Sequence, residues 1–352
     1  MTVTINGSGP ITGSDRAESG VNDDITSLGA VTSLNGGQLA GLRNRIINGG
    51  MVIDQRNDGA LFTATSTAPY CVDRWVVYSN PTSKFTAQRI TGGPFVGHSN
   101  YLSVTSTSAY SVAAPDSMVL TQRIEGYNFA DLAFGTASAS SITLSFKVSS
   151  SLTGTFGGSV QNAGTDRSYP FTYSIPVAGV VTNISVTIPG DTAGTWPQGN
   201  GLAIAVIFGL GVGTNRSTTA GAWAAGNYYS ATGATSVVGT SGATFNITGV
   251  QLEVGSVATP FEHRPYGMEL ALCQRYYEKG AVWFDSPINA TTGAKGQTVY
   301  FKVAKRSAGA TITKTDTSAS TAADTTQLDS FRIYTTSNTA AILSTWTASS
   351  EL

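Results

Sequence analysis

The sequence has 352 residues, a formal net charge of −1 and 12% charged residues, against about 25% in ordinary globular proteins. Hydrophobic residues still make up 41% of the chain, so the low charge does not indicate disorder. A net charge near zero gives no long-range field that would attract nucleic acid or an anionic membrane, and neither partner is expected. The 40 glycines and the abundant Ser and Thr favour strands and tight turns over helices. The length predicts about two or three domains.

Residues 1–45 are polar, rich in glycine and without a convincing core. Within them ITSLGA (25–30) is followed by VTSLNG (31–36), which places Ile25, Leu28, Val31 and Leu34 at intervals of three. Three chains around an axis could bury this stripe together, whereas a flexible leader is the alternative. The start has neither the basic region nor the apolar core of a signal peptide, and the longest apolar run, residues 202–212, is too short to span a membrane. We therefore expect a product made in a cytoplasm and not inserted into a membrane.

Residues 46–264 alternate between apolar and polar side chains with a period of two. In residues 141–149 the apolar side chains of Ile142, Leu144, Phe146 and Val148 alternate with polar ones, which predicts a strand with one buried face. Residues 202–208 are apolar at nearly every position and predict a central strand that is covered on both sides. The inward face changes parity at Gly249, which predicts a β-bulge there. Further strands are predicted at 51–56, 72–78, 84–90, 101–106, 117–125, 168–175 and 181–188. These strands predict an all-β fold, an antiparallel β-sandwich and most simply a jelly roll.

Residues 265–280 interrupt this pattern. From Met268 to Lys279, apolar groups lie nearly all round a helix of about three turns, with Pro265 before it and Gly280 after it. Such a helix must be buried on more than one side, against neighbouring subunits or between two domains of one chain. We expect the trimer interface at Leu270, Leu272, Tyr276 and Tyr277.

Residues 281–352 return to alternation, in TVYFKVAKR (298–306) and SFRIYT (330–335). A unit of this size buries too small a fraction of its surface to be very stable by itself. We therefore predict a small distal β-domain that is completed by trimerisation.

Three segments carry a resemblance to a known family. They are FNITGVQLEVGSVATPFEHRPYGMELALCQRYYEK (245–279), RNRIINGGMVIDQRN (43–57) and VDRW (72–75). Together they resemble the tail-fibre proteins of tailed bacteriophages, which have a jelly-roll core similar to carbohydrate-binding modules and a C-terminal receptor-binding domain. The resemblance implies an elongated homotrimer in the virion tail, made in the cytoplasm of a host bacterium. It also implies that the N-terminus docks to the phage tail or to a baseplate or adaptor protein, and that the distal part recognises a host receptor, a glycan or lipopolysaccharide.

Enzymatic function is not expected. GLGVGTNR (209–216) follows a strand as a dinucleotide loop would, but no helix pattern follows it. Two cysteines and two histidines do not make a recognisable metal site, and no cofactor is expected. Three carboxylate pairs could in principle serve a polysaccharide depolymerase, which is one alternative, and a purely structural collar or spacer protein is the other. The pairs are Asp54 with Asp58, Glu125 with Asp131, and Glu253 with Glu262.

The candidate glycan-binding residues are aromatic side chains, on which sugar rings stack, and cations suited to acidic glycans. One group lies in loops after the strands of the sandwich, and the other lies in the distal domain. The alternative for the loop group is that these rings fill subunit interfaces or cap the sandwich. The alternative for the distal group is that they are ordinary strand residues with solvated outer charges. The candidates are Trp196, Trp223, Tyr228, Tyr229, Trp283, Tyr300, Lys302, Arg306, Arg332, Tyr334 and Trp346.

Overall fold

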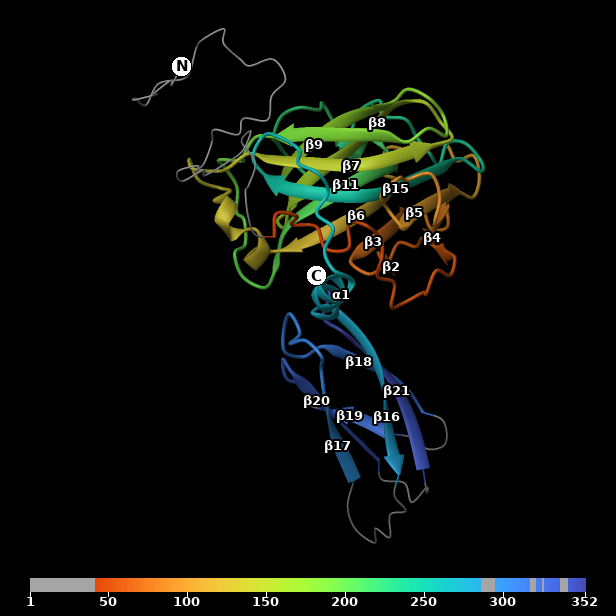
Figure 1. Cartoon of the computed structure of the whole chain (residues 1–352). Coiled ribbons are helices and arrows are strands. Elements are labelled where there is room, and N and C mark those ends of the chain that lie inside the picture. Colours follow the sequence, from red (N-terminus) through yellow and green to blue (C-terminus); the bar gives the residue numbers. More distant parts are fainter. Residues whose placement is uncertain (1–41, 286–294, 317–320, 325, 336–340) are drawn as a thin grey trace, which may run out of the picture.

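The computed structural model describes residues 42–285, 295–316, 321–324, 326–335 and 341–352, and the three-spaced stripe predicted for residues 25–34 lies outside them. The described residues form two β-rich units, with the only α-helix among them, α1 (Tyr266–Gln274), between the two (Figure 1). The last residues of the chain return to lie beside α1 (Figure 1). None of the helices in these residues is long and apolar enough to cross a membrane.

The larger unit is an antiparallel β-sandwich, which confirms the prediction of an all-β sandwich for this part of the chain. Its six-stranded sheet contains, in spatial order, β1 (Phe62–Thr63), β4 (Phe85–Thr91), β5 (Asn100–Ser106), β15 (Thr244–Val254), β7 (Ile142–Ser150) and β10 (Thr182–Ile188). Its seven-stranded sheet contains β13 (Ala224–Ala225), β9 (Arg167–Ile175), β8 (Gly154–Asn162), β11 (Leu202–Val212), β6 (Ser117–Glu125), β3 (Trp75–Asn80) and β2 (Tyr70–Val72). Two short strands, β12 (Ser217–Thr218) and β14 (Ser230–Ala231), pair in parallel outside these sheets. Three 3-10 turns are η1 (Gly126–Asn128), η2 (Ala130–Leu132) and η3 (Thr214–Arg216).

One hydrophobic core fills the space between the two sheets. The alternating residues of β7 point into it, and Phe146 meets Phe208 of β11 at 5.1 Å between ring centroids. β11 is buried at every position except its two ends, as predicted. Its inward residues join the main core, whereas Ala205 and Ile207 belong to a second apolar cluster on the outward face.

The bulge predicted at Gly249 is present. The register between β15 and β7 shifts between Thr248 and Gln251, and Gly249 has a φ of +62°. A side chain there would meet His98, since a Cβ would lie 2.8 Å from the imidazole Cε1. Glycine therefore allows the strand to slip by one residue and the loop before β5 to approach it closely.

Residues 43–57 form a strap across the sandwich and not the predicted strand at 51–56, which is wrong. The side chain of Asn48 explains the difference, because its Nδ2 donates to Ile53 O at 2.7 Å and its Oδ1 accepts from Ile53 N at 3.0 Å. These hydrogen bonds close a turn in place of a sheet ladder. Met51 also takes a left-handed backbone conformation, with a φ of 57°.

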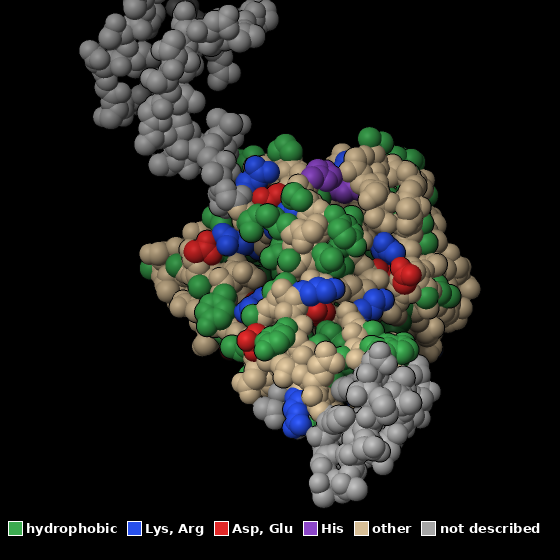
Figure 2. Space-filling model, turned by 60° about the horizontal axis from the view of Figure 1, so that its bottom comes forward, with side chains coloured by type: hydrophobic (Ala, Val, Ile, Leu, Met, Phe, Trp, Pro, Cys, Tyr) green, Lys and Arg blue, Asp and Glu red, His purple; other side chains and the backbone are tan. Residues whose placement is uncertain are grey.

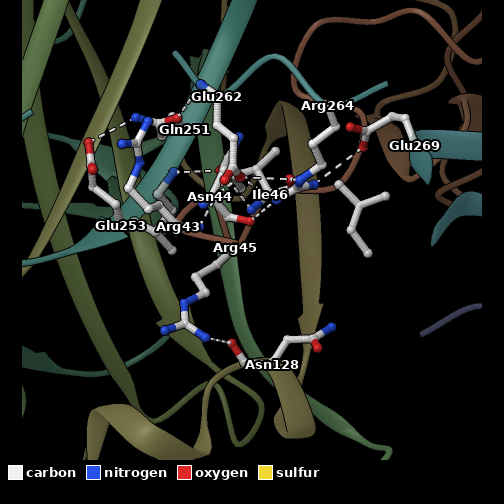
Figure 3. Close-up of polar contacts among 12 residues, drawn as sticks. Arg43, Asn44, Arg45, Ile46, Asn128, Gln251, Glu253, Glu262, Arg264 and Glu269 are labelled. Carbon is white, nitrogen blue, oxygen red and sulfur yellow. Dashed lines mark hydrogen bonds and ion pairs between the residues drawn. The ribbon is translucent and has the colours of Figure 1, made fainter. Parts of the chain in front are cut away.

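The strap, the segment that follows β15, and α1 are tied together by ionic groups (Figure 3). Glu262 accepts hydrogen bonds from Arg43 N and Asn44 N, each at 3.1 Å. The guanidinium of Arg264 contacts both Glu262, at 3.1 Å, and Glu269 of α1, at 3.5 Å. Segments more than 200 residues apart in sequence therefore form one joint.

The helix is shorter and more polar on its buried side than predicted. α1 ends at Gln274, and Tyr277 begins the strand β16 (Tyr277–Asp285), so the expected boundary at residue 280 falls inside a strand. The buried residues of α1 are Glu269, Cys273 and Gln274, while Met268 is exposed. The prediction of an apolar surface buried all round is therefore wrong.

Of the residues predicted for a subunit interface, Tyr276 is completely buried within this chain, so that prediction is wrong for it. Its hydroxyl donates to Glu125 Oε2 at 2.6 Å, and the Arg74 guanidinium lies 3.6 Å from its ring centroid. Tyr277 is half-buried beneath the Arg56 guanidinium, also at 3.6 Å. Leu270 and Leu272 are half-buried.

The C-terminal β-unit contains two three-stranded sheets packed around a small core. One sheet has the order β16, β21 (Ala341–Ser349) and β18 (Thr311–Asp316), and the other has β17 (Lys295–Tyr300), β20 (Ser330–Thr335) and β19 (Thr321–Asp324). The predicted strand 298–306 ends at Tyr300 because the chain then turns back, with Phe301 N bonded to Asp329 O and Lys305 N to Leu328 O. Phe301, Phe331 and Trp346 form the centre of this core.

The last residues of the chain fasten the C-terminal β-unit to the sandwich. The Glu351 carboxylate forms ion pairs with Arg74 and, at 2.9 Å, with Arg56. Arg306 donates to Ser350 O at 2.7 Å and also to Asn200 O, in the sandwich, at 2.7 Å. The contact between the two units is therefore built within a single chain.

Candidate functional site

The tryptophan predicted to stack on a sugar at Trp196 is instead part of the core. Its side chain is only 7% exposed, and it packs edge-on against Phe134 at 4.9 Å and Trp223 at 5.5 Å. Its indole Nε1 donates to Ala193 O at 3.0 Å. Trp223 is half-buried in the same cluster, with its Nε1 bonded to Pro189 O at 2.7 Å. The two rings close one end of the sandwich, and the prediction of an open platform is wrong for Trp196.

Trp346 is likewise buried, at 5% exposure, against Phe331 and Phe301. Gly280, directly opposite on β16, makes room for it, because a Cβ there would lie 2.5 Å from the indole. The guanidinium of Arg306 donates hydrogen bonds to backbone carbonyl groups of Ser350 and Asn200, between the two units. Neither side chain therefore presents the ligand-binding surface that the sequence predicts.

The remaining distal candidates lie on two different sheets. Trp283 is 56% exposed on β16, and Tyr300 is 72% exposed on β17. Lys302 and Arg332 are exposed, and Tyr334 is half-buried with the Arg332 guanidinium 5.4 Å from its ring. Because the two sheets pack through Val282 and Val299, the neighbours of Trp283 and Tyr300, these two rings face opposite sides of the unit. The structure does not gather them into one patch.

Tyr229 lies elsewhere, over the outward face of the seven-stranded sheet. There a groove of about 270 Å³ runs across β3, β6, β11 and β8, and we call it the sheet groove. Tyr228, the neighbouring candidate, is half-buried, and its ring packs against Gly226, where a Cβ would lie 2.7 Å from it. The lining residues of the sheet groove are Ala68, Val76, Tyr78, Val119, Thr121, Arg123, Gln161, Asn162, Thr165, Leu202, Ala205, Ile207 and Tyr229.

Strand register explains why these side chains meet. Thr121 of β6 pairs with Val76 of β3 and with Ile207 of β11, and the next outward row pairs Arg123 with Ala205 and Ala205 with Gln161. Residues two apart on a strand share a face, so the rows form one continuous surface. The sheet groove therefore crosses four strands that are distant in sequence.

The floor of the sheet groove is apolar, and two tyrosines pack against it. Val119, Ala205 and Ile207 form a cluster against which the half-buried Tyr78 and Tyr229 pack. Tyrosine rings present apolar faces for the C–H surface of a sugar and a hydroxyl for its polar edge. The floor and the two tyrosines thus supply the stacking surface that the loop tryptophans do not.

The polar groups of the sheet groove are held in place by hydrogen bonds. The Gln161 amide nitrogen donates to Ser168 Oγ at 3.1 Å and to Asn227 Oδ1 at 2.9 Å, which turns its carbonyl oxygen toward other donors. Arg123 donates to Leu352 O and keeps further guanidinium donors. No Asp or Glu is among the described residues that line the groove. This arrangement can accept and orient hydroxyl groups.

The carboxylate pairs considered for hydrolysis are engaged in structural contacts. Glu125 accepts from Arg275 Nη2 at 2.5 Å, and Glu253 accepts from Thr259 N at 2.8 Å and from Thr259 Oγ1 at 2.6 Å. Glu253 also accepts from Gln251 Nε2 at 2.9 Å (Figure 3). Asp54 accepts from Gly59 N at 2.7 Å in a turn. None of these three presents a free carboxylate to a ligand. Within the described ranges there is also no group of three or more His, Cys, Asp or Glu that could hold a metal ion.

The sequence did not single out Tyr78, Gln161 or Arg123. Tyr78 and Arg123 occupy outward positions of strands that were predicted, so alternation could have placed them on the outer face. Gln161 is the next-to-last residue of β8, a Gly-rich strand that was not predicted. The sequence feature that could have located the groove is an outward-facing tyrosine on a strand whose other outward residues carry almost no charge.

No protein-family model matches the sequence, and no curated protein is similar to it. Solved structures with some similarity include the enzymatically active domain of tailspike protein 4 from bacteriophage CBA120, at 12% identity and a TM-score of 0.34, over 60% of this chain and 21% of the tailspike chain. A family 11 carbohydrate-binding module from Clostridium thermocellum, in complex with a β-1,3-1,4-mixed-linked tetrasaccharide, matches at 12% identity and a TM-score of 0.28, over 58% of this chain and 98% of the module. The module-containing xylanase 10B of Clostridium thermocellum, complexed with xylohexaose, matches at 12% identity and a TM-score of 0.29, over 58% of this chain and 30% of the xylanase chain. At these scores the similarities do not by themselves assign a function.

Proposed function

We propose that this chain is a non-catalytic structural protein of the tail-fibre kind that binds a host-surface glycan in the sheet groove. The observation that carries the proposal is the convergence, on one outward sheet face, of an apolar floor, two tyrosines and oriented hydroxyl-binding groups. Sugar recognition needs this combination, because a sugar ring has an apolar face and a polar edge. The motifs of residues 43–57, 72–75 and 245–279 support the tail-fibre assignment through their resemblance to that family.

Removing the stacking rings tests glycan binding. Wild-type protein is expected to bind one or more members of an array of bacterial surface polysaccharides and lipopolysaccharides. Replacing Tyr229 or Tyr78 by Ala should weaken that binding by roughly tenfold each, on the order of one aromatic contact. Trp283→Ala, which removes an exposed ring on the C-terminal β-unit, is the matched control and should bind like wild type.

Several outcomes would contradict this assignment. Binding that survives both tyrosine substitutions but is lost in Trp283→Ala would move recognition to the C-terminal β-unit. Absence of binding to every glycan would favour the structural collar or spacer, and release of oligosaccharides from a bound polysaccharide would favour the depolymerase.

We also infer a homotrimer whose N-terminal segment docks to the tail, as the resemblance implies. Tyr266 and Met268 on α1 are 64% and 44% exposed, and Leu42, directly before the strap, is 49% exposed. These side chains leave apolar surface that neighbouring subunits could cover. Light scattering at micromolar concentration is expected to give a trimer, and Leu272→Asp, at a half-buried position, should shift it toward monomer. A wild-type monomer would contradict the assembly without bearing on the sheet groove.

A further inference from the structure

A second hollow lies on the opposite side of the sandwich, over the outward face of the six-stranded sheet. Its volume is about 510 Å³, within the range of about 300–1,000 Å³ that is common for small-ligand pockets. It is bounded by β7, β10, the loop before β5 and residues 258–263. The sheet groove lies on the other sheet, so the two sites are separated by the full thickness of the sandwich.

The floor of this hollow is polar. On β7 and β10, Lys147 pairs with Asn183 and Ser145 pairs with Ser185, and all four side chains alternate with residues that pack toward the core. They therefore stand together on the outer face of the sheet. One cation, one amide and two hydroxyls form a surface suited to an oxygen-rich ligand.

The wall of the hollow is aromatic. His98, Phe261 and His263 contact one another, with ring centroids 4.9 Å apart for His98 and Phe261 and 5.3 Å apart for the two imidazoles. The bulge at Gly249 lets His98 approach the sheet. The segment that carries the other two rings is fixed by hydrogen bonds from Thr259 to Glu253 and from Glu262 N to Gln251.

The polar side chains of the floor and the two histidines have no hydrogen-bond or ion-pair partner among the described residues of the protein. The structure gives no side-chain hydrogen bond or ion pair within those residues for Lys147, either imidazole, Asn183, Ser145 or Ser185. Elsewhere in the described residues ten ion pairs engage seven arginines. These side chains are exposed or half-buried and are not engaged by the protein, so they are accessible to a ligand.

The charge of the hollow is positive. No Asp or Glu is among the described residues that line it. Burial, followed by the positive charges of His263 and Lys147, lowers the pKa of His98 to about 4. His98 is therefore neutral at pH 7, and the Lys147 ammonium supplies the fixed cation. The histidine side chains form one contiguous group on the surface (Figure 2), where charged side chains of both signs are otherwise scattered.

We propose that this hollow binds an anionic saccharide residue, such as a uronate or a phosphate-substituted sugar. The Lys147 ammonium would hold the anionic group, Asn183 and the two serines would bind ring hydroxyls, and Phe261 with His263 would cover the apolar face of the ring. The charge requirement distinguishes this site from the sheet groove, in which hydroxyl recognition and stacking are the main features. The proposal does not depend on the function assigned to that groove.

The chain contains only two histidines, and both line this hollow, so their imidazole NMR signals report on it directly. Glucuronate and glucose 6-phosphate, titrated separately into the full-length protein, are the probes, with glucose and inorganic phosphate as controls. At least one of the two anionic sugars should shift both signals to saturation, and glucose should not. The bound anion should also raise the pKa of His98, because it favours the imidazolium. Saturation with glucuronate would identify the bound anionic group as a carboxylate, and saturation with glucose 6-phosphate would identify it as a phosphate.

Lys147→Gln removes the charge at a half-buried surface position and should weaken binding at least tenfold while the two imidazole signals remain those of a folded protein. Lys302→Gln, an exposed lysine of the C-terminal β-unit, is the matched control and should bind like wild type. No shift with either anionic sugar, or equal affinity of Lys147→Gln and wild type, would overturn the proposal. Equal affinity for inorganic phosphate and glucose 6-phosphate would overturn the assignment of a saccharide. Tyr78→Ala should leave these titrations unchanged, so failure here is distinguishable from failure in the sheet groove.

Discussion

Replacing Lys305 by Met is expected to lower the free energy of unfolding by about 3–5 kcal/mol, the cost of leaving a buried charge without its partner. The ammonium of Lys305 is completely buried, 2.6 Å from the carboxylate of Glu278, which is itself 1% exposed. It also donates to Gln274 O, at the end of α1, at 2.5 Å. Met fills a similar volume but leaves the buried Glu278 carboxylate without a cation, with the Lys302 backbone N–H at 3.2 Å as its remaining hydrogen-bond donor in the described residues.

Urea denaturation of wild type and Lys305→Met measures this loss, with Lys302→Met as an exposed control that should unfold like wild type. The double variant Lys305→Met with Glu278→Gln removes both charges and should recover a large part of the stability. An unchanged denaturation midpoint in Lys305→Met would show that the pair is not buried in solution.

The second large effect is expected at Arg74, where substitution by Met should cost about 3 kcal/mol. Arg74 is 1% exposed, forms an ion pair with Glu351, donates from Nη2 to Arg123 O at 2.6 Å and stacks on Tyr276. Because Glu351 keeps its pair with Arg56, the expected loss is at the lower end for a buried ion pair. Arg74 has a φ of 71°. Arg and Met both carry a Cβ, so this backbone conformation costs the wild type and the variant about the same free energy.

A double-mutant cycle with Glu351→Gln separates the ion pair from the rest of the Arg74 contacts. We expect a coupling free energy of about 1–3 kcal/mol between the two positions. In Arg74→Met, the contact between the sandwich and the C-terminal β-unit should also become accessible to proteases under conditions in which the sandwich is still folded. Additive effects of the two substitutions would contradict an ion pair between them.

Alternation along the chain predicted the sandwich because each strand carries its own signal. Residues 117–125 were predicted as a strand with the bounds that β6 has in the structure, and the parity change at Gly249 located the bulge. β8 was missed because its sequence, GTFGGSVQN, has few apolar residues. Gly158 is required by its neighbours in space, since a Cβ there would lie 2.4 Å from Ile207 O of the adjacent strand.

The binding sites were less predictable, because burial of a single aromatic residue depends on the whole fold. Trp196 and Trp346 have loop-like or alternating neighbours in sequence, yet both are core residues. The sheet groove needs the register of four strands, and the second hollow needs a bulge that brings His98 against Gly249. Sequence spacing contains no direct record of either juxtaposition.

A crystal structure of the protein in complex with the glycan that binds best in the array would locate the glycan-binding site. We expect a sugar ring in the sheet groove, between Tyr78 and Tyr229, with a hydroxyl within hydrogen-bond distance of Gln161 Oε1. A glycan seated instead on the exposed faces of Trp283 or Tyr300, with the sheet groove free, would contradict this expectation.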